Sequence, residues 1–160
     1  MNKKKTDSQQ DLYGTKEVAQ ILGIPEWRVK NFSDGAVYRL PPTIQVGSGR
    51  GSRKLYDRPG VFRLGVADHL LKFGFAPESV GQAVREIPES VLRPYGFKGK
   101  DKVGLTPALF NLGNGIWRHR LMKDAPTRSL SQGEIPSLFV LNLAYVCDLV
   151  FAGFERYWAR

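Results

Sequence analysis

The chain has 160 residues, of which 42% are hydrophobic and 24% charged, and this composition is typical of a globular protein with one domain or two small ones. Its 24 Lys and Arg residues outnumber 15 Asp and Glu residues, and the formal charge of +9 favours a polyanionic partner, of which nucleic acid is the commonest. The single cysteine, Cys147, excludes an internal disulfide and a multi-cysteine zinc site, and the apolar run around it predicts a buried thiol.

Neither end of the chain has the pattern of a secretory signal or a membrane span. The opening segment MNKKKTDSQQ is basic and polar, and no apolar segment follows it, so we expect residues 1–11 to form a disordered basic tail. The apolar run from Leu138 to Phe154 is interrupted by Asn142 and Asp148, which argues against a membrane span. We therefore expect a cytoplasmic protein.

Two short helices are predicted near the start of the chain. Thr15 is a good N-cap, and the apolar residues that follow it at helical spacing are Val18, Ile21 and Leu22. Gly23 is expected to end the first helix, and Pro25 opens a second helix that contains Trp27 to Phe32. Two short helices joined through one glycine are typical of a helix-turn-helix.

A β-hairpin is predicted after the second helix. Residues 34–53 are rich in glycine and proline, and within them Thr43 to Val46 has β character. Lys54 to Tyr56 can return as a second strand, which places the sequence Gly-Ser-Gly-Arg-Gly-Ser at the tip. A hairpin with a flexible tip and basic residues beside it is typical of a wing.

Two further helices are predicted between Asp57 and Pro88. Asp57 can cap the third helix, and its apolar face consists of Val61, Phe62, Leu64, Val66, Leu70 and Leu71. Gly74 ends it. The fourth helix begins at Pro77, and its inward residues are Val80, Ala83, Val84 and Ile87. Pro88 closes this segment, and we place a domain boundary there.

The remaining 72 residues, 89–160, are less regular. Residues 96–102 form a basic linker, residues 108–112 and 116–122 predict a hairpin around Gly113-Asn114-Gly115, and residues 124–134 are a polar loop. Pro136 is expected to open a helix that reaches about Tyr157 and is apolar on nearly every face. Such a helix must be buried. A second copy of the chain could bury it, so we predict a homodimer through Leu138 to Tyr157.

The segments LYGTKEVAQILGIPEWRVKNF and GSGRGSRKLYDRPGVFRLGVADHLLKFGFAPESVGQAV resemble the DNA-binding domain of the MerR family of bacterial transcription regulators. The shared features are the opening T-K-E-V-A, the Leu-Gly-Ile turn, a basic wing that ends in tyrosine, and a late Gly-Phe pair. The resemblance covers about half of the chain. It implies a winged helix-turn-helix domain at residues 12–88. Together with the elements expected after Pro88, we predict a mainly α fold with a small α+β or helical dimerisation or effector region at residues 89–160.

The resemblance further implies that the second helix enters the major groove of double-stranded DNA while the wing grips the backbone. The candidate DNA-binding residues are Thr15, Lys16, Trp27, Arg28, Lys30, Asn31, Arg50, Arg53, Lys54 and Tyr56. We expect the side chains of Arg28 and Lys54 to be exposed. Two alternatives stay open: the wing cations belong to a solvated hairpin, and Tyr56 packs against the third helix. Asn31 stands where the family usually has an aromatic residue.

The chain departs from the family pattern after Ile87. Pro88, Pro94 and Gly96 interrupt the long dimerisation helix of typical members, and metal-sensing members use several cysteines. His69 and His119 have no ligand cluster beside them in the sequence, and the segment Gly47 to Gly51 lacks the ending of a P-loop. We therefore expect no metal, no cofactor, no catalytic residues and no enzymatic activity.

Three functions are compatible with these observations. The leading one is a sequence-specific, homodimeric transcription regulator associated with the bacterial nucleoid, for which RNA polymerase is a further candidate partner. The second is an excisionase-like or architectural DNA-binding protein of a mobile element that binds repeated sites. The third is an adaptor whose carboxy-terminal region recruits a partner protein. The cluster Arg118-His119-Arg120 is a candidate second nucleic-acid contact, with an exposed basic strand as the alternative.

Overall fold

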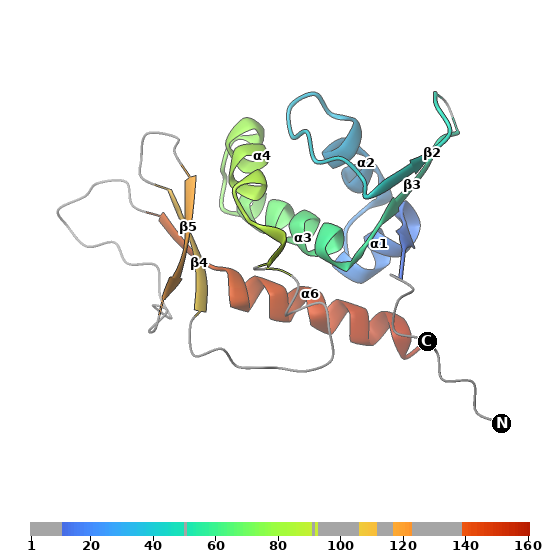
Figure 1. Ribbon diagram of the computed structural model, residues 1–160. Coiled ribbons are helices and arrows are strands. Elements are labelled where there is room, and N and C mark those ends of the chain that lie inside the picture. Colours follow the sequence, from blue (N-terminus) through green and yellow to red (C-terminus); the bar gives the residue numbers. More distant parts are fainter. Residues whose placement is uncertain (1–10, 50, 91, 93–105, 112–116, 123–138) are drawn as a thin grey trace.

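The computed structural model describes residues 11–49, 51–90, 92, 106–111, 117–122 and 139–160, and this part of the chain is mainly helical with two small sheets (Figure 1). The elements in order are β1 (Tyr13–Gly14), α1 (Thr15–Leu22), α2 (Glu26–Asp34), β2 (Ile44–Val46), β3 (Arg53–Tyr56), α3 (Arg58–Lys72), α4 (Pro77–Arg85), β4 (Thr106–Asn111), β5 (Trp117–Met122), β6 (Phe139–Asn142) and α6 (Leu143–Trp158). Residues 89, 90 and 92 are also helical.

Helix α1 begins one residue earlier than the predicted cap allows. Gly14 is the N-cap, and Thr15 is the first helical residue. The reason is that Tyr13 and Gly14 pair with β3 as an extended strand, so the backbone turns into the helix directly after Gly14. The carboxylate of Glu17 accepts a hydrogen bond from the Gly14 amide at 2.6 Å. The carboxy-terminal end of α1 is as expected, since Gly23 takes a left-handed conformation with φ of 66°.

Helix α2 follows after a three-residue turn. Pro25 is its N-cap, and the amide of Ile24 donates to the carbonyl of Ala19 at 3.0 Å, which closes the turn against α1. Val29 and Phe32 are the buried residues of α2. The predicted pair of short helices is therefore confirmed.

The predicted hairpin is also confirmed. Strands β2 and β3 pair antiparallel, with Val46 opposite Arg53, and β1 adds to the other edge of β3. Glycines 47, 49 and 51 at the tip all have positive φ, a conformation that other residues rarely adopt. Figure 1 shows the hairpin extending away from the helices on the same side of the molecule as α2.

Helices α3 and α4 agree with the prediction. Asp57 caps α3 by accepting a hydrogen bond from the Gly60 amide at 2.8 Å. Gly74, with φ of 84°, follows the end of α3, and Pro77 opens α4. Both helices bury the apolar residues expected for them, including Val61, Val66, Val80 and Val84.

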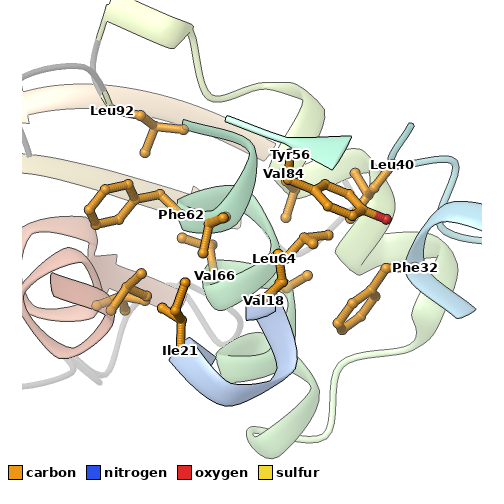
Figure 2. Close-up of a cluster of buried hydrophobic side chains, with 14 of the residues drawn as sticks. Val18, Ile21, Phe32, Leu40, Tyr56, Phe62, Leu64, Val66, Val84 and Leu92 are labelled. Atoms are coloured by element: carbon orange, nitrogen blue, oxygen red, sulfur yellow. The ribbon is translucent and has the colours of Figure 1, made fainter. Parts of the chain in front are cut away.

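One hydrophobic core joins both halves of the chain. Figure 2 shows Ile21 of α1, Phe62 of α3 and Leu92 within one cluster of buried side chains. Helix α6 packs against α1 and α3, and its buried residues are Leu143, Val146, Cys147, Val150, Gly153 and Phe154. The core is therefore continuous across residue 88, while the division into domains at that residue stays a prediction.

The single cysteine lies within this core, as expected. Burial, with the charge of Asp148 as the second cause, raises the pKa of the Cys147 thiol to about 12. The thiol is therefore protonated at neutral pH, and a protonated thiol is a poor nucleophile.

The expected helix from Pro136 to about Tyr157 is wrong at its start. Phe139–Asn142 forms strand β6, which pairs antiparallel with β4, and α6 begins only at Leu143. A short apolar run fits a strand as well as a helix, and pairing with the edge of β4 decides in favour of the strand. The predicted pairing of two strands after residue 105 is confirmed by β4 and β5.

Several predicted features lie outside the described residues. They are the basic tail up to residue 10, the basic linker at 96–102, the turn between β4 and β5, the polar loop at 124–134, and Arg50 at the tip of the hairpin. The side chains of Arg118, His119 and Arg120 are likewise outside the description, although these residues lie in β5.

Candidate nucleic-acid interface

Helix α2 presents a polar and aromatic face to solvent. Val29 and Phe32 point into the core, and the helical repeat of 100° per residue places Trp27, Lys30 and Asn31 on the opposite face. All three are exposed, and Trp27 has an exposed fraction of 58%. An exposed tryptophan is unusual, because burying so large a side chain would remove much apolar surface from water. The face therefore combines an apolar ring, a cation and an amide within reach of one ligand.

The hairpin lies next to this helix and carries a second exposed cation. Arg53 is exposed on β3, and Lys16 is exposed at the start of α1, where Thr15 is half-buried. The end of α2 is tied to β3, since the ammonium of Lys54 pairs with the Asp34 carboxylate. The exposed cations Lys16, Lys30 and Arg53 thus belong to three neighbouring elements, and Figure 1 shows α2 and the hairpin on the side of the molecule away from α6.

The expected exposure is wrong for Lys54, and Arg28 is only partly exposed. The Lys54 side chain is only 9% exposed, and besides Asp34 it donates to the hydroxyl of Ser33 at 3.1 Å. The guanidinium of Arg28 is 32% exposed and donates to Asp68 of α3 at 2.8 Å. Both carboxylates lie in other elements, far along the chain, so the sequence did not show them as partners. These two cations hold α2 against β3 and α3.

Asp68 is the residue that the sequence analysis missed. Its carboxylate is nearly buried and binds two cations, Arg28 at 2.8 Å and Lys72 at 2.7 Å. A signal was present, because Asp68 stands within the apolar face of a helix, and a buried carboxylate requires a charged or hydrogen-bonding partner. The neighbouring histidine, His69, is half-buried, and burial lowers its pKa, with the charge of Lys72 as the second cause.

Tyr56 belongs to the core. Its exposed fraction is 1%, and Figure 2 shows it among the buried side chains together with Leu40 and Val84. Burial raises the pKa of its phenol. This burial agrees with the alternative that Tyr56 packs against the third helix, since β3 contacts α3, and the side chain is not part of the exposed face.

The excess positive charge lies mostly outside this interface. Between residues 11 and 92, eleven Lys and Arg residues stand against nine Asp and Glu residues, whereas the corresponding numbers between residues 93 and 138 are eight and three. The exposed acid Glu26 also lies on α2. The candidate interface therefore depends on where a few cations are placed and not on a strong overall field.

A comparison of the chain with models of known protein families gives no match, and a search of curated protein sequences gives no match either. The resemblance to MerR regulators therefore stays a prediction. Within the described ranges, no helix is long and apolar enough to cross a membrane. Among the residues that the structure describes, no group of three or more His, Cys, Asp or Glu side chains could hold a metal ion.

Proposed function

We propose that this protein is a sequence-specific, double-stranded DNA-binding transcriptional regulator of the MerR type. In this proposal α1 and α2 form a helix-turn-helix, and β2 and β3 form its wing. The observation that carries it is the outward face of α2, where Trp27, Lys30 and Asn31 are exposed beside the projecting hairpin with Arg53. A short helix of this kind fits the major groove, and a hairpin beside it reaches the phosphate backbone.

The exposed residues divide into two roles. Lys30, Arg53 and Lys16 would neutralise phosphates, which supplies affinity without reading sequence. Asn31 can bond the edge of adenine with two hydrogen bonds, and the ring of Trp27 offers an apolar surface to a thymine methyl group. Arg28 and Lys54 act as positioning residues, because their ion pairs fix the orientation of α2.

A homodimer through α6 is part of the proposal. Large apolar side chains are exposed on α6 and at the end of α3, namely Tyr145, Leu149 and Phe73. Figure 1 shows α6 on the side of α1 and α3 opposite to α2, so a dimer formed through α6 would leave both α2 helices open to DNA. Such a dimer would bind two half-sites related by two-fold symmetry. A cytoplasmic, nucleoid-associated location and contact with RNA polymerase belong to the same proposal.

The first test is selection of bound duplexes from a random DNA library with the full-length protein, followed by sequencing. An enriched inverted repeat is the expected result and supports a dimeric regulator. Enriched direct repeats would favour the excisionase-like alternative. A library without enrichment at moderate salt would overturn the proposal of sequence-specific recognition.

The second test measures the affinity of variants for the selected duplex. Lys30→Ala and Arg53→Ala should weaken binding to all sequences. Each should also reduce the slope of log binding constant against log salt concentration by about one, because one counterion fewer is released. Asn31→Ala should cost about 1–3 kcal/mol on the preferred site and little on other sites. Arg160→Ala removes an exposed cation at the end of the chain and serves as the control. Equal losses for Arg160→Ala and Lys30→Ala would contradict the assigned face.

A further inference from the structure

Two contacts link the interior of α3 to the exposed face of α2. The Asp68 carboxylate, whose side chain is 6% exposed, accepts a hydrogen bond from the Arg28 guanidinium at 2.8 Å. The same guanidinium lies over the ring of Trp27, 5.8 Å from the ring centroid. Trp27 is itself largely exposed to solvent. Arg28 therefore connects a nearly buried carboxylate to the largest exposed side chain of α2.

The burial of Asp68 fixes the position of Arg28. A carboxylate removed from water is costly unless it is paired and hydrogen-bonded. Its second oxygen is bound by Lys72 at 2.7 Å, but the Lys72 side chain is 62% exposed and remains solvated. Departure of Arg28 would leave the buried charge with this solvated ammonium. The guanidinium is therefore held on Asp68 although 32% of it is exposed.

Two consequences follow for the face of α2 that carries Trp27. A cation over an aromatic ring attracts the ring, so the fixed guanidinium restricts the ring of Trp27 to one orientation. A guanidinium whose charge is already matched by a carboxylate is also a weaker ligand for a second anion, such as a phosphate. The state of Arg28 thus depends on the charge of Asp68.

We propose that Asp68 is a specificity-determining residue of the DNA interface. Through Arg28 it orients the ring of Trp27 toward a thymine methyl group, and it keeps the guanidinium off the phosphates. Asp68 is a positioning residue, because it acts through Arg28 and does not touch DNA. Fewer phosphate contacts lower the affinity for all sequences, and a fixed ring improves discrimination between bases. This inference rests on the proposed function.

The first measurement needs no DNA. The protein is labelled with 5-fluorotryptophan at its three tryptophans, and the ¹⁹F resonance of Trp27 is the one absent in Trp27→Phe. Asp68→Asn should shift this resonance toward its position in the urea-unfolded protein. Arg28→Ala should shift it in the same direction, which tests the contact even if Asp68→Asn does not fold. Glu78→Gln removes an exposed carboxylate from α4 and should leave it unchanged. An unmoved resonance in folded Asp68→Asn would overturn the proposal.

The second measurement compares the affinities of full-length variants for the selected duplex and for duplexes of unrelated sequence. Replacing the contacted thymine by uracil should weaken wild-type binding about fourfold, the effect of one methyl group removed from water, and should weaken Asp68→Asn binding less than about twofold. Asp68→Asn should bind unrelated duplexes about fivefold more tightly at 0.1 M salt, with a salt slope steeper by about one. Glu78→Gln, which changes the net charge equally, should show neither effect. The gain should vanish when Asp68→Asn is combined with Arg28→Ala.

The outcomes distinguish this inference from the proposed function. Failure of the wild-type protein to bind any duplex would overturn the proposed function and the role of Asp68 with it, even if the Trp27 resonance moves. Sequence-specific binding by the wild type, with unchanged uracil discrimination and unchanged affinity for unrelated duplexes in Asp68→Asn, would overturn the role of Asp68 alone.

Discussion

Helices α2 and α6, on opposite sides of the molecule, are held in place by different interactions. On one side, α2 buries Val29 and Phe32 and is fixed to its neighbours by ion pairs of Arg28 and Lys54. On the other side, α6 contributes a row of fully buried apolar residues to the core. Ion pairs at the flanks of α2 leave its outer face open for a ligand. The position of α6 is set instead by the tight packing of its buried side chains against α1 and α3.

Close backbone contacts mark the α6 side. A Cβ atom added at Gly153 would lie 2.0 Å from the carbonyl oxygen of Ile21, and one at Gly65 would lie 2.4 Å from Cγ2 of Val150. Both distances are far below van der Waals contact; the atom that opposes Gly153 belongs to the backbone of α1, whereas a side chain at Gly65 would have to displace the Val150 side chain. The two sides should therefore respond differently to added volume and to salt.

The largest effect is expected for Gly153→Ala. The added methyl group meets the backbone of α1, which cannot rotate away, so α6 must move outward and lose core contacts. We expect a loss of about 3 kcal/mol in the free energy of unfolding, measured by urea denaturation followed by circular dichroism. Gly14→Ala is the control, since a Cβ there would lie 3.4 Å from Glu17 Oε2, in ordinary contact, and the change should cost no more than about 1 kcal/mol through the poorer N-cap. Similar losses in both variants would contradict the conclusion that close packing of α6 on α1 requires glycine at position 153.

A smaller, salt-dependent effect is expected for Asp68→Asn. The change removes the charge that holds Arg28 and Lys72, and both cations can then turn toward water because neither is buried. We expect a loss of about 1.5 kcal/mol at low salt, with a smaller difference from wild type at 1 M NaCl, where charges are screened. The loss in Gly153→Ala should be independent of salt. Asp148→Asn, at an exposed position on α6, is the control.

The smallest effect is expected for Tyr157→Phe, and it should depend on pH. The Tyr157 hydroxyl donates to Glu17 at 2.7 Å, and this bond, with the Gly14 amide second, lowers the pKa of Glu17 below its ordinary value of 4.5. A lowered pKa in the folded state contributes stability that is present above pH 4.5 and is lost as the pH falls through the folded value.

Tyr157→Phe should therefore be slightly less stable than wild type at pH 7 and equal to it at low pH. The measurement is the urea midpoint at pH 7, 5 and 3. In a Glu17→Gln background, Tyr157→Phe should lose its pH dependence. A constant difference between the two proteins at every pH would show that the hydroxyl acts through another partner.

The sequence predicted the segments whose structure depends on near neighbours along the chain. Gly23 and Gly74 end helices, Asp57 caps α3, and the glycines of the hairpin tip take positive φ, because each of these features needs only a few adjacent residues. The resemblance to MerR regulators implied Trp27, Lys30 and Asn31 as DNA contacts; all three are exposed, while their role in DNA binding stays a proposal.

What the sequence by itself determined is thus the local order of helices, turns and hairpin between Tyr13 and Ile87, together with the residue types on each helix face. Tertiary structure alone decided that Asp68 and Asp34 bind Arg28 and Lys54, that Tyr56 is buried, and that residues 139–142 join β4 as a strand. The physical reason is distance along the chain. A cation, an aromatic ring or an apolar run takes its position from partners that only folding brings near, and local propensity does not specify those partners.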